Sequence, residues 1–474
     1  MDVMRPPRKP CSGNGRMEGQ WTSRGVRNVA ERQVVTVVGG GLAGSECALQ
    51  LARRGIGVRL YEQRPAAPAP AHHTDRLAEL VCSNSLKSLR EESAAGLLKW
   101  ELDQMGSQLM RMARESAVPA GGALAVDRDA FSTMVTQAVE SCPDIELVRE
   151  EVREVPEGPC VIAAGPLCSE RLFSALCELV GTQHLSFYDA AAPIVDAETI
   201  DMDVAFSQSR YEDGVGDYLN CPMDREEYDA FMEQLLAARR VVSRDFEETD
   251  LFNACQPVEE VARKGHDTLR FGALKPVGIV DPRTGRRPWA NVQLRPENAD
   301  LTAYNIVGFQ TNLTWGEQAR VFRMIPGLEH AEFFRYGVMH RNSFVDAPRV
   351  LDGSFAVPGT QVRLAGQITG TEGYTEAIAS GLLAAVNTFA DLQGLPHLEL
   401  PRTTALGALV AYATNPETDP YQPMHVNFGL VPPLEGRRMR KGERYAAYAE
   451  RAKQDLAACL SRREDLFVGG SERL

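Results

Sequence analysis

The sequence of 474 residues lacks several features that define whole classes of protein. No apolar run approaches the ~18 residues of a membrane-spanning helix, and the N-terminus has no long apolar segment of the kind found in secretion signals. Positive charge is not in excess, because the formal net charge is −13, which argues against broad, nonspecific binding to nucleic acid. We therefore expect a cytoplasmic protein without a membrane partner, on which any RNA-binding basic face is local.

Paired cysteines are also missing. The ten cysteines are scattered, with neither a C-x-x-C pair nor the spacing of a zinc site, so we expect reduced thiols and no metal. A simple flavin oxidoreductase, such as an NADH oxidase or a thiol reductase, would require a C-x-x-C pair or a second G-x-G-x-x-G, and the sequence has neither.

Residues 34–62 contain a complete strand–helix–strand unit. The β-branched run Val34–Val38 predicts a buried parallel strand. A glycine-rich turn with the spacing G-x-G-x-x-G follows, then an expected helix over Ser45–Arg54 and a second strand over Val58–Tyr61, which ends at Glu62. This order is typical of a dinucleotide-binding fold.

The turn has the residues that a pyrophosphate needs. Its glycines allow a tight turn, close approach of the backbone to phosphate and close packing of helix on strand, and the helix N-terminus offers N–H donors. A carboxylate about 20 residues later can bind a ribose. The expected cofactor residues are Gly39, Gly40, Gly41, Leu42, Ala43, Gly44 and Glu62. The motif alone fits FAD or NAD, and a glycine-rich turn without a ligand is the alternative.

Two later segments carry similar signals. Residues 160–166 read as a strand that breaks at Gly165, and a glycine-rich turn containing Gly366, Gln367 and Gly370 leads into an expected helix over Thr375–Ala385. We therefore predict an α/β protein with a discontinuous Rossmann-like FAD-binding domain, residues 34–195 and 335–474, interrupted by an α+β domain, residues 196–334. Residues 1–33 are polar and are expected to form a disordered leader.

The remaining patterns predict individual elements. An amphipathic helix is expected over residues 93–114, a helix start at Asp127–Asp129, and helices over residues 225–240 and 443–460. Residues 290–294 read as a strand.

Three further stretches contain candidate functional residues. Cys82 stands in a polar turn with Lys87 nearby, where a thiol can be nucleophilic, although a buried structural cysteine is the alternative. His340, in the MHRN stretch, is either a residue that stacks on a flat ligand or a structural histidine. The basic cluster Arg437, Arg438, Arg440 and Lys441 is a hypothetical RNA contact. The alternative is that it is a solvent-exposed segment at the start of a helix.

Taken together, these stretches resemble the TrmFO family of folate- and FAD-dependent tRNA (uracil-5-)-methyltransferases. The resemblance is carried by VVGGGLAGSECA, LVCSNSLKS, CQPVEEVARKGHDTLRFGALKPVGIVDP, NIVGFQTNLTWGEQARVF, FFRYGVMHRNSF and LAGQITGTEGYTEAIASG. The related MnmG family shares the first glycine motif and a similar GQ-x-x-G-x-x-GY stretch but is longer.

The resemblance implies bound FAD, 5,10-methylenetetrahydrofolate as one-carbon donor, NADPH or NADH as reductant, and 5-methyluridine at position 54 of the tRNA T-loop as product. It implies that Cys82 is the nucleophile, that Cys255 is a second catalytic thiol and that His340 lies against the folate. The alternatives are the same chemistry on a ribosomal RNA uridine, and a simple flavin NAD(P)H oxidoreductase.

Overall fold

The computed structural model describes residues 33–67, 72–181, 185–190, 192–211, 216–241, 256–337, 339–419, 421–435 and 439–467, and for 185–190 and 339–341 only the backbone. The predicted leader therefore lies outside the described residues, apart from Gln33. The described chain from Gln33 onward forms one compact unit.

A five-stranded parallel sheet forms the nucleotide-binding half. Its order is β16-β7-β1-β2-β6, and its strands are β1 Val34–Val38, β2 Gly57–Tyr61, β6 Ile145–Val148, β7 Cys160–Ile162 and β16 Val362–Leu364. The β-branched strand β1 lies at the centre, as expected for a strand covered on both faces. Because β16 comes from the last third of the chain and pairs with β7, distant parts of the sequence build one sheet.

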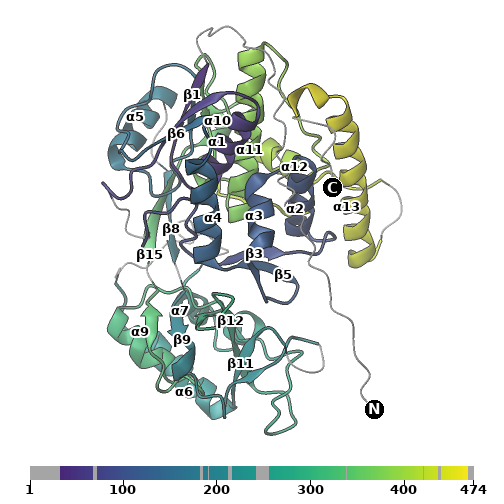
Figure 1. Ribbon diagram of the computed structural model, residues 1–474. Coiled ribbons are helices and arrows are strands. Elements are labelled where there is room, and N and C mark those ends of the chain that lie inside the picture. The colour runs from purple at the N-terminus through teal and green to yellow at the C-terminus, as the bar shows by residue number, and fades with distance from the viewer. Residues whose placement is uncertain are drawn as a thin grey trace, which may run out of the picture. The chain divides into compact units, whose positions relative to one another are not determined.

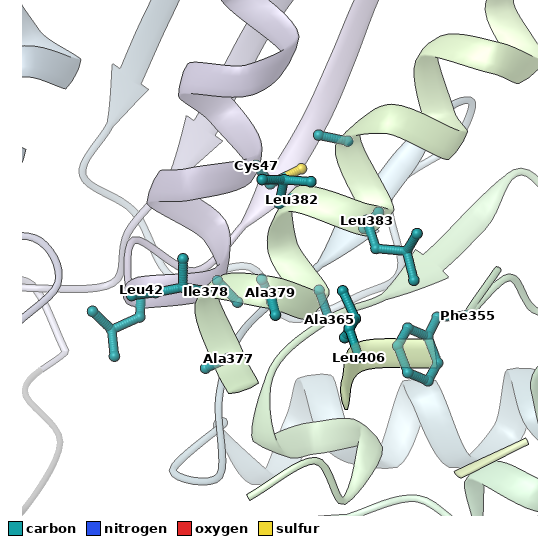
Figure 2. Close-up of a cluster of buried hydrophobic side chains, with 14 of the residues drawn as sticks. Leu42, Cys47, Phe355, Ala365, Ala377, Ile378, Ala379, Leu382, Leu383 and Leu406 are labelled. Atoms are coloured by element: carbon teal, nitrogen blue, oxygen red, sulfur yellow. The ribbon is translucent and has the colours of Figure 1, made fainter. Parts of the chain in front are cut away.

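Helices from the same two parts of the chain pack against each other. They are α1 (Leu42–Arg53) and α11 (Tyr374–Gln393), drawn together in Figure 1. Figure 2 shows their buried apolar side chains in one cluster, including Cys47 and Leu382. A Cβ atom at Gly381 would lie 2.1 Å from the carbonyl oxygen of Ala43, so the two helix backbones approach closely only because this residue is glycine. Helix α11 extends beyond the predicted Ala385 because its following turn is also buried.

The single helix predicted over residues 93–114 is wrong. The structure has two helices there, α2 (Ala94–Gln104) and α3 (Gln108–Glu115). Gly106 has φ +75°, which ends the first helix, and the Ser107 hydroxyl accepts the Met110 N–H and starts the second. The apolar pattern continued through the break because both helices face the same core.

Buried acids tie neighbouring helices together. Glu101 on α2 accepts hydrogen bonds from the first N–H groups of α12 (Ala405–Ala413), with Oε1 2.6 Å from Ala405 N and Oε2 3.0 Å from Leu406 N. Burial nevertheless raises the pKa of Glu101 to about 7, because the two hydrogen bonds offset only part of the loss of water. Glu101 therefore adds to the cap of α12 that Thr404 provides, whose hydroxyl accepts the Gly407 N–H at 3.0 Å.

The middle of the chain builds a second sheet and a second core. The sheet has the order β10-β11-β12-β13-β9-β14 with antiparallel pairing. Its strands are β9 Ile194–Asp196, β10 Phe206–Ser207, β11 Leu219–Met223, β12 Ala290–Pro296, β13 Ala303–Ile306 and β14 Phe333–Arg335. Helices α6 (Arg225–Ala237), α7 (Val258–Arg263) and α9 (Trp315–Phe322) lie with this sheet in Figure 1. The short helix α8 (Thr268–Phe271) contributes Leu269 to the same core. The core includes Phe309 and Phe322, whose rings meet edge to face.

These two sheets confirm the predicted fold class, an α/β protein with a Rossmann-like half built from both ends of the chain and an inserted α+β part. The chain enters and leaves the insertion next to β8 (Leu185–Ala190) and β15 (Met339–Phe344), which pair antiparallel. The domain boundaries at residues 195/196 and 334/335 stay a prediction.

The remaining elements complete the core around the first sheet. They are β3 Ser85–Ser88, β4 Ala117–Val118, β5 Ala123–Val126, α4 Arg128–Glu140, α5 Glu170–Val180, α10 Ala347–Val350 and α13 Lys441–Ser461, with short 3-10 helices at Gln367–Thr369 and Glu464–Leu466. Another 3-10 helix, Ala197–Thr199, belongs to the second core. Helix α4 begins as predicted, with Asp127 as its cap. Among the described residues, no helix combines the length and the apolar character needed to cross a membrane.

Candidate active site

The turn after β1 is shaped by three glycines that serve different purposes. Gly39 has φ +104°, a conformation that favours glycine. A Cβ atom at Gly44 would lie 1.8 Å from the Gly39 carbonyl oxygen, so this residue must be glycine for the turn to close. A Cβ atom at Gly41 would meet no protein atom within 4 Å, and Gly41 has an ordinary extended backbone (φ −74°, ψ −167°). The protein itself therefore does not require glycine at 41, whereas a phosphate resting against the backbone would.

Glu62, at the end of β2, holds this turn in place. Its Oε2 accepts the Gly40 N–H at 3.0 Å, and its Oε1 accepts from Arg64 Nε at 2.9 Å. Burial alone would raise the pKa of Glu62, but the hydrogen bond and charge of Arg64 outweigh it and hold the pKa below its ordinary value. Glu62 is thus an ionised, buried carboxylate at the edge of the pocket.

A pocket opens over this turn. It is lined by Gly39, Gly41, Leu42, Ala43, Glu62, Gly366 and Gln367 among the predicted cofactor residues. Two helices begin at the pocket, α1 after Gly41 and α11 after Gly373, and no side chain caps either helix. A helix N-terminus presents unsatisfied N–H groups and favours anions. The open space at Gly41 and the two uncapped helix ends fit a bound dinucleotide such as FAD.

The other predicted cofactor residues lie behind the pocket. Gly40 and Gly44 shape the turn, and Gly370 is in the left-handed region (φ +76°), where a Cβ atom would meet the Tyr421 hydroxyl at 2.4 Å. Several residues that line the pocket were not predicted from the sequence, including Arg64, Cys168 and Tyr374. A signal was present for Tyr374, because it directly follows the glycine-rich turn at 366–373.

Tyr374 connects the pocket to the turn that carries Cys82. Its hydroxyl oxygen accepts the backbone N–H groups of Cys82 at 2.8 Å and Ser83 at 3.1 Å. Burial raises the pKa of Tyr374 above its ordinary value, and the nearby Cys82 raises it further. The hydroxyl therefore keeps its proton at neutral pH. The residue before Cys82, Val81, lines the pocket directly. The pocket and the candidate nucleophile therefore share one wall.

Three arginines from different elements bind the turn of residues 80–84. Arg128 on α4 donates to the Leu80 carbonyl, and Arg335 on β14 donates to the Val81 carbonyl at 2.5 Å. Arg295 on β12 donates to Ser83 Oγ at 2.8 Å and Asn84 Oδ1 at 2.9 Å.

All three arginines interact electrostatically with Cys82, and a single carboxylate, Glu297, pairs with Arg128 at 2.5 Å. Lys87, which the sequence suggested as the neighbouring cation, instead pairs with Glu376, with Nζ 3.5 Å from Oε1.

Other cysteines near the pocket have a different environment. Burial raises the pKa of Cys168, which lines the pocket, to about 12, and also raises the pKa of Cys47. Such thiols remain protonated and unreactive. Cys82 is only half-buried and lies outside the core clusters. Within the described residues, no group of three or more His, Cys, Asp or Glu side chains is arranged to hold a metal ion.

Of the remaining predicted site residues, the structure describes the backbone of His340 and the side chains of Arg440 and Lys441. The backbone of His340 lies in β15 opposite Asp189, and the strand then reaches the pocket rim, where Ser343 N–H donates to the Pro166 carbonyl at 2.9 Å. Arg440 and Lys441 are exposed at the start of α13. Cys255, Arg437 and Arg438 lie outside the described residues.

Comparisons with known proteins agree with this geometry. Residues 34–396 match the family described as Glucose inhibited division protein A. Curated relatives named methylenetetrahydrofolate–tRNA-(uracil-5-)-methyltransferase TrmFO include those of Shouchella clausii, 51% identical over 90% of this chain and 98% of the relative, and Geobacter sulfurreducens, 55% identical over 89% and 98%.

Among solved structures, Aquifex aeolicus GidA has a similar fold, with a TM-score of 0.64 at 16% identity, covering 92% of this chain and 77% of that one. At this low identity the similarity to GidA shows only that the folds are alike. The much higher identity to the curated relatives, over nearly their whole length, shows the family. The chain therefore belongs to the TrmFO family, within the wider GidA family.

Proposed function

We propose that this protein methylates carbon 5 of uridine 54 in the T-loop of tRNA, in the cytoplasm. It takes the carbon from 5,10-methylenetetrahydrofolate and electrons from NADPH or NADH, with FAD bound in the pocket. The observation that carries this proposal is the shared wall, in which Tyr374 lines the pocket and also accepts the backbone N–H of Cys82. The names of the curated relatives support the choice of reaction.

The chemistry requires a nucleophile because carbon 5 of uracil is unreactive. Addition of the Cys82 thiolate to carbon 6 forms a C–S bond and makes carbon 5 nucleophilic toward the methylene carbon. A base then removes the carbon 5 proton as the C–N bond to the folate breaks, which releases tetrahydrofolate and leaves a methylene group on carbon 5. Addition of a hydride equivalent to this methylene expels the thiolate, restores the ring and gives the methyl group. Arg128, Arg295 and Arg335 hold the turn of residues 80–84 that presents Cys82. FAD, when bound, supplies the two electrons that reduce the carbon from methylene to methyl, and NAD(P)H is consumed as their source.

Three assignments complete the proposal. Cys255 acts as the second thiol and removes the proton from carbon 5. His340 lies against the pterin ring of the folate, supported by the course of β15 to the pocket rim. Arg437, Arg438, Arg440 and Lys441 contact the tRNA backbone, which would offset the overall negative charge.

The test is an assay with purified protein, an unmodified tRNA transcript, methylenetetrahydrofolate and NADPH, with detection of 5-methyluridine. Cys82→Ala is expected to lose methylation while retaining bound flavin, because the backbone N–H of residue 82, which donates to the Tyr374 hydroxyl, is kept in the variant. Cys142→Ala is the matched control, since Cys142 is also half-buried but lies away from the pocket. Full activity of the Cys82 variant would exclude Cys82 as the nucleophile.

The same assay separates the alternatives. Product that forms without folate, or NADPH oxidation without 5-methyluridine, would favour a simple flavin oxidoreductase. Methylation of a ribosomal RNA fragment but not of tRNA would show that the substrate is ribosomal RNA and that the reaction is the one proposed.

A further inference from the structure

We propose that Phe333, Tyr336 and Trp315 form a stacking platform for an RNA base adjacent to the uridine that is methylated. This inference rests on the proposed function and names the part of the protein that receives the neighbouring nucleotide. We call these three side chains the aromatic platform.

The aromatic platform is a ladder of nearly parallel rings. The ring centroids of Phe333 and Tyr336 are 5.1 Å apart with planes 24° apart, and those of Tyr336 and Trp315 are 5.9 Å apart with planes 16° apart. Phe333 packs against the second core, whereas Trp315 is 61% exposed. The ladder thus begins in the core and ends at an open indole ring. An open indole ring supported by stacked rings beneath it offers a flat apolar face to a planar ligand.

A buried glutamine fixes the rings of Tyr336 and Trp315 in place. Gln318, one turn after Trp315 on α9, is fully buried. Its Nε2 donates to the Gly337 carbonyl at 2.9 Å and the Leu313 carbonyl at 2.8 Å, and its Oε1 accepts the Gly337 N–H at 2.8 Å. The segment carrying Tyr336 is therefore clamped to the start of α9. Rings held in this way lose little freedom when a ligand stacks on them.

The aromatic platform adjoins the turn that carries the candidate nucleophile. Arg335, immediately before Tyr336, donates to the carbonyl of Val81, immediately before Cys82. A base that enters the site must leave its stack, and its neighbour then loses a stacking partner. An aromatic ring beside the site replaces that partner, and base–aromatic stacking is tolerant of sequence.

The helix that carries Trp315 suits a polyanion. Glu317 on α9 is flanked by two arginines, Arg239 at 3.3 Å and Arg320 at 2.7 Å, so this carboxylate is neutralised with one positive charge remaining. The guanidinium of Arg323, at the end of α9, lies 5.9 Å from the Phe333 ring. Aromatic rings and arginines on one element are typical of surfaces that bind single-stranded nucleic acid.

The test compares three variants of the flavin-loaded protein, with an unmodified tRNA transcript and methylenetetrahydrofolate as probes. Trp315→Ala removes the open ring, and Trp315→Phe retains a smaller one. Phe334→Ala is the matched control, because Phe334 is 62% exposed next to Phe333 but its ring is not part of the stacked ladder. The measurements are the Kd for tRNA, the KM values for tRNA and folate, and the flavin content.

We expect Trp315→Ala to weaken tRNA binding about 5- to 150-fold, Trp315→Phe to keep most of the affinity, and Phe334→Ala to match the parent. Flavin content and the KM for folate should not change. Parent-like tRNA affinity of Trp315→Ala would refute the platform while leaving the proposed function intact. A loss confined to the KM for folate would also refute it and assign the ring to the pterin. If the parent protein neither binds nor methylates tRNA, both proposals fail.

Discussion

The space at Gly41 gives a sharp test of the cofactor pocket. Gly41→Ala adds a methyl group where no protein atom lies within 4 Å, at a backbone conformation that alanine adopts freely. We therefore expect the apoprotein to be as stable as the parent or slightly more so, by about 0.4–1 kcal/mol, because alanine restricts the unfolded chain. The methyl group points into space that lines the pocket, where a pyrophosphate would approach the start of α1.

The magnitude follows from the hydrogen bonds that such a methyl group would block. A hydrogen bond between a backbone N–H and a charged phosphate contributes about 1.5–3 kcal/mol, so the loss of one corresponds to about 10- to 150-fold weaker FAD binding. The assay is fluorescence titration of apoprotein with FAD, together with thermal unfolding without FAD.

Gly353→Ala is the matched control, since a Cβ atom there also meets nothing within 4 Å and Gly353 does not line the pocket. Parent-like FAD affinity of Gly41→Ala would refute the assignment of this turn to the phosphates.

Three further predictions concern stability. Gly44→Ala should unfold more easily, by about 1–3 kcal/mol or more in urea titrations, because its methyl group would lie 1.8 Å from the Gly39 carbonyl oxygen. Asn84→Ala should cost about 2–4 kcal/mol and reduce kcat, because the buried Asn84 amide joins Arg295 to two carbonyl groups; unchanged kcat would show that the turn does not need this support.

Glu101→Gln should remove part of the pH dependence of the protein's stability. The Glu101 pKa is about 7 in the folded protein against 4.5 in the unfolded chain, so the folded protein loses stability as pH rises between these values. For Glu101 alone, the free energy of unfolding falls by about 2.5 kcal/mol from pH 5 to pH 8. Urea titrations at the two pH values should therefore show that the free energy of unfolding falls by about 2.5 kcal/mol less in the variant than in the parent. An equal decrease in both proteins would contradict the burial argument.

The nucleotide-binding unit could be predicted from sequence because its signals are local. Strand, glycine turn, helix and acid follow one another within about 30 residues, and each is determined by its own backbone requirements. The break at Gly106 was missed because hydrophobic periodicity reports which face is buried, not whether the helix continues. A glycine with a serine after it is a weak signal inside an otherwise periodic segment.

The surroundings of Cys82 could not be predicted. The sequence suggested Lys87 as the neighbouring cation because it is close along the chain. The actual partners are Arg128, Arg295 and Arg335, which come from three separate elements. Their arrangement depends on how the inserted part docks on the turn, and no local pattern encodes such docking.

The close packing of α1 and α11 has a consequence for how the protein is made. The first helix end at the pocket emerges from the ribosome early, whereas the second begins only at Tyr374 of a 474-residue chain. Contacts between residues so far apart in sequence form late in folding. A nascent chain therefore cannot complete the cofactor cradle until most of it has been synthesised, and cofactor retention reports that both ends of the chain have met.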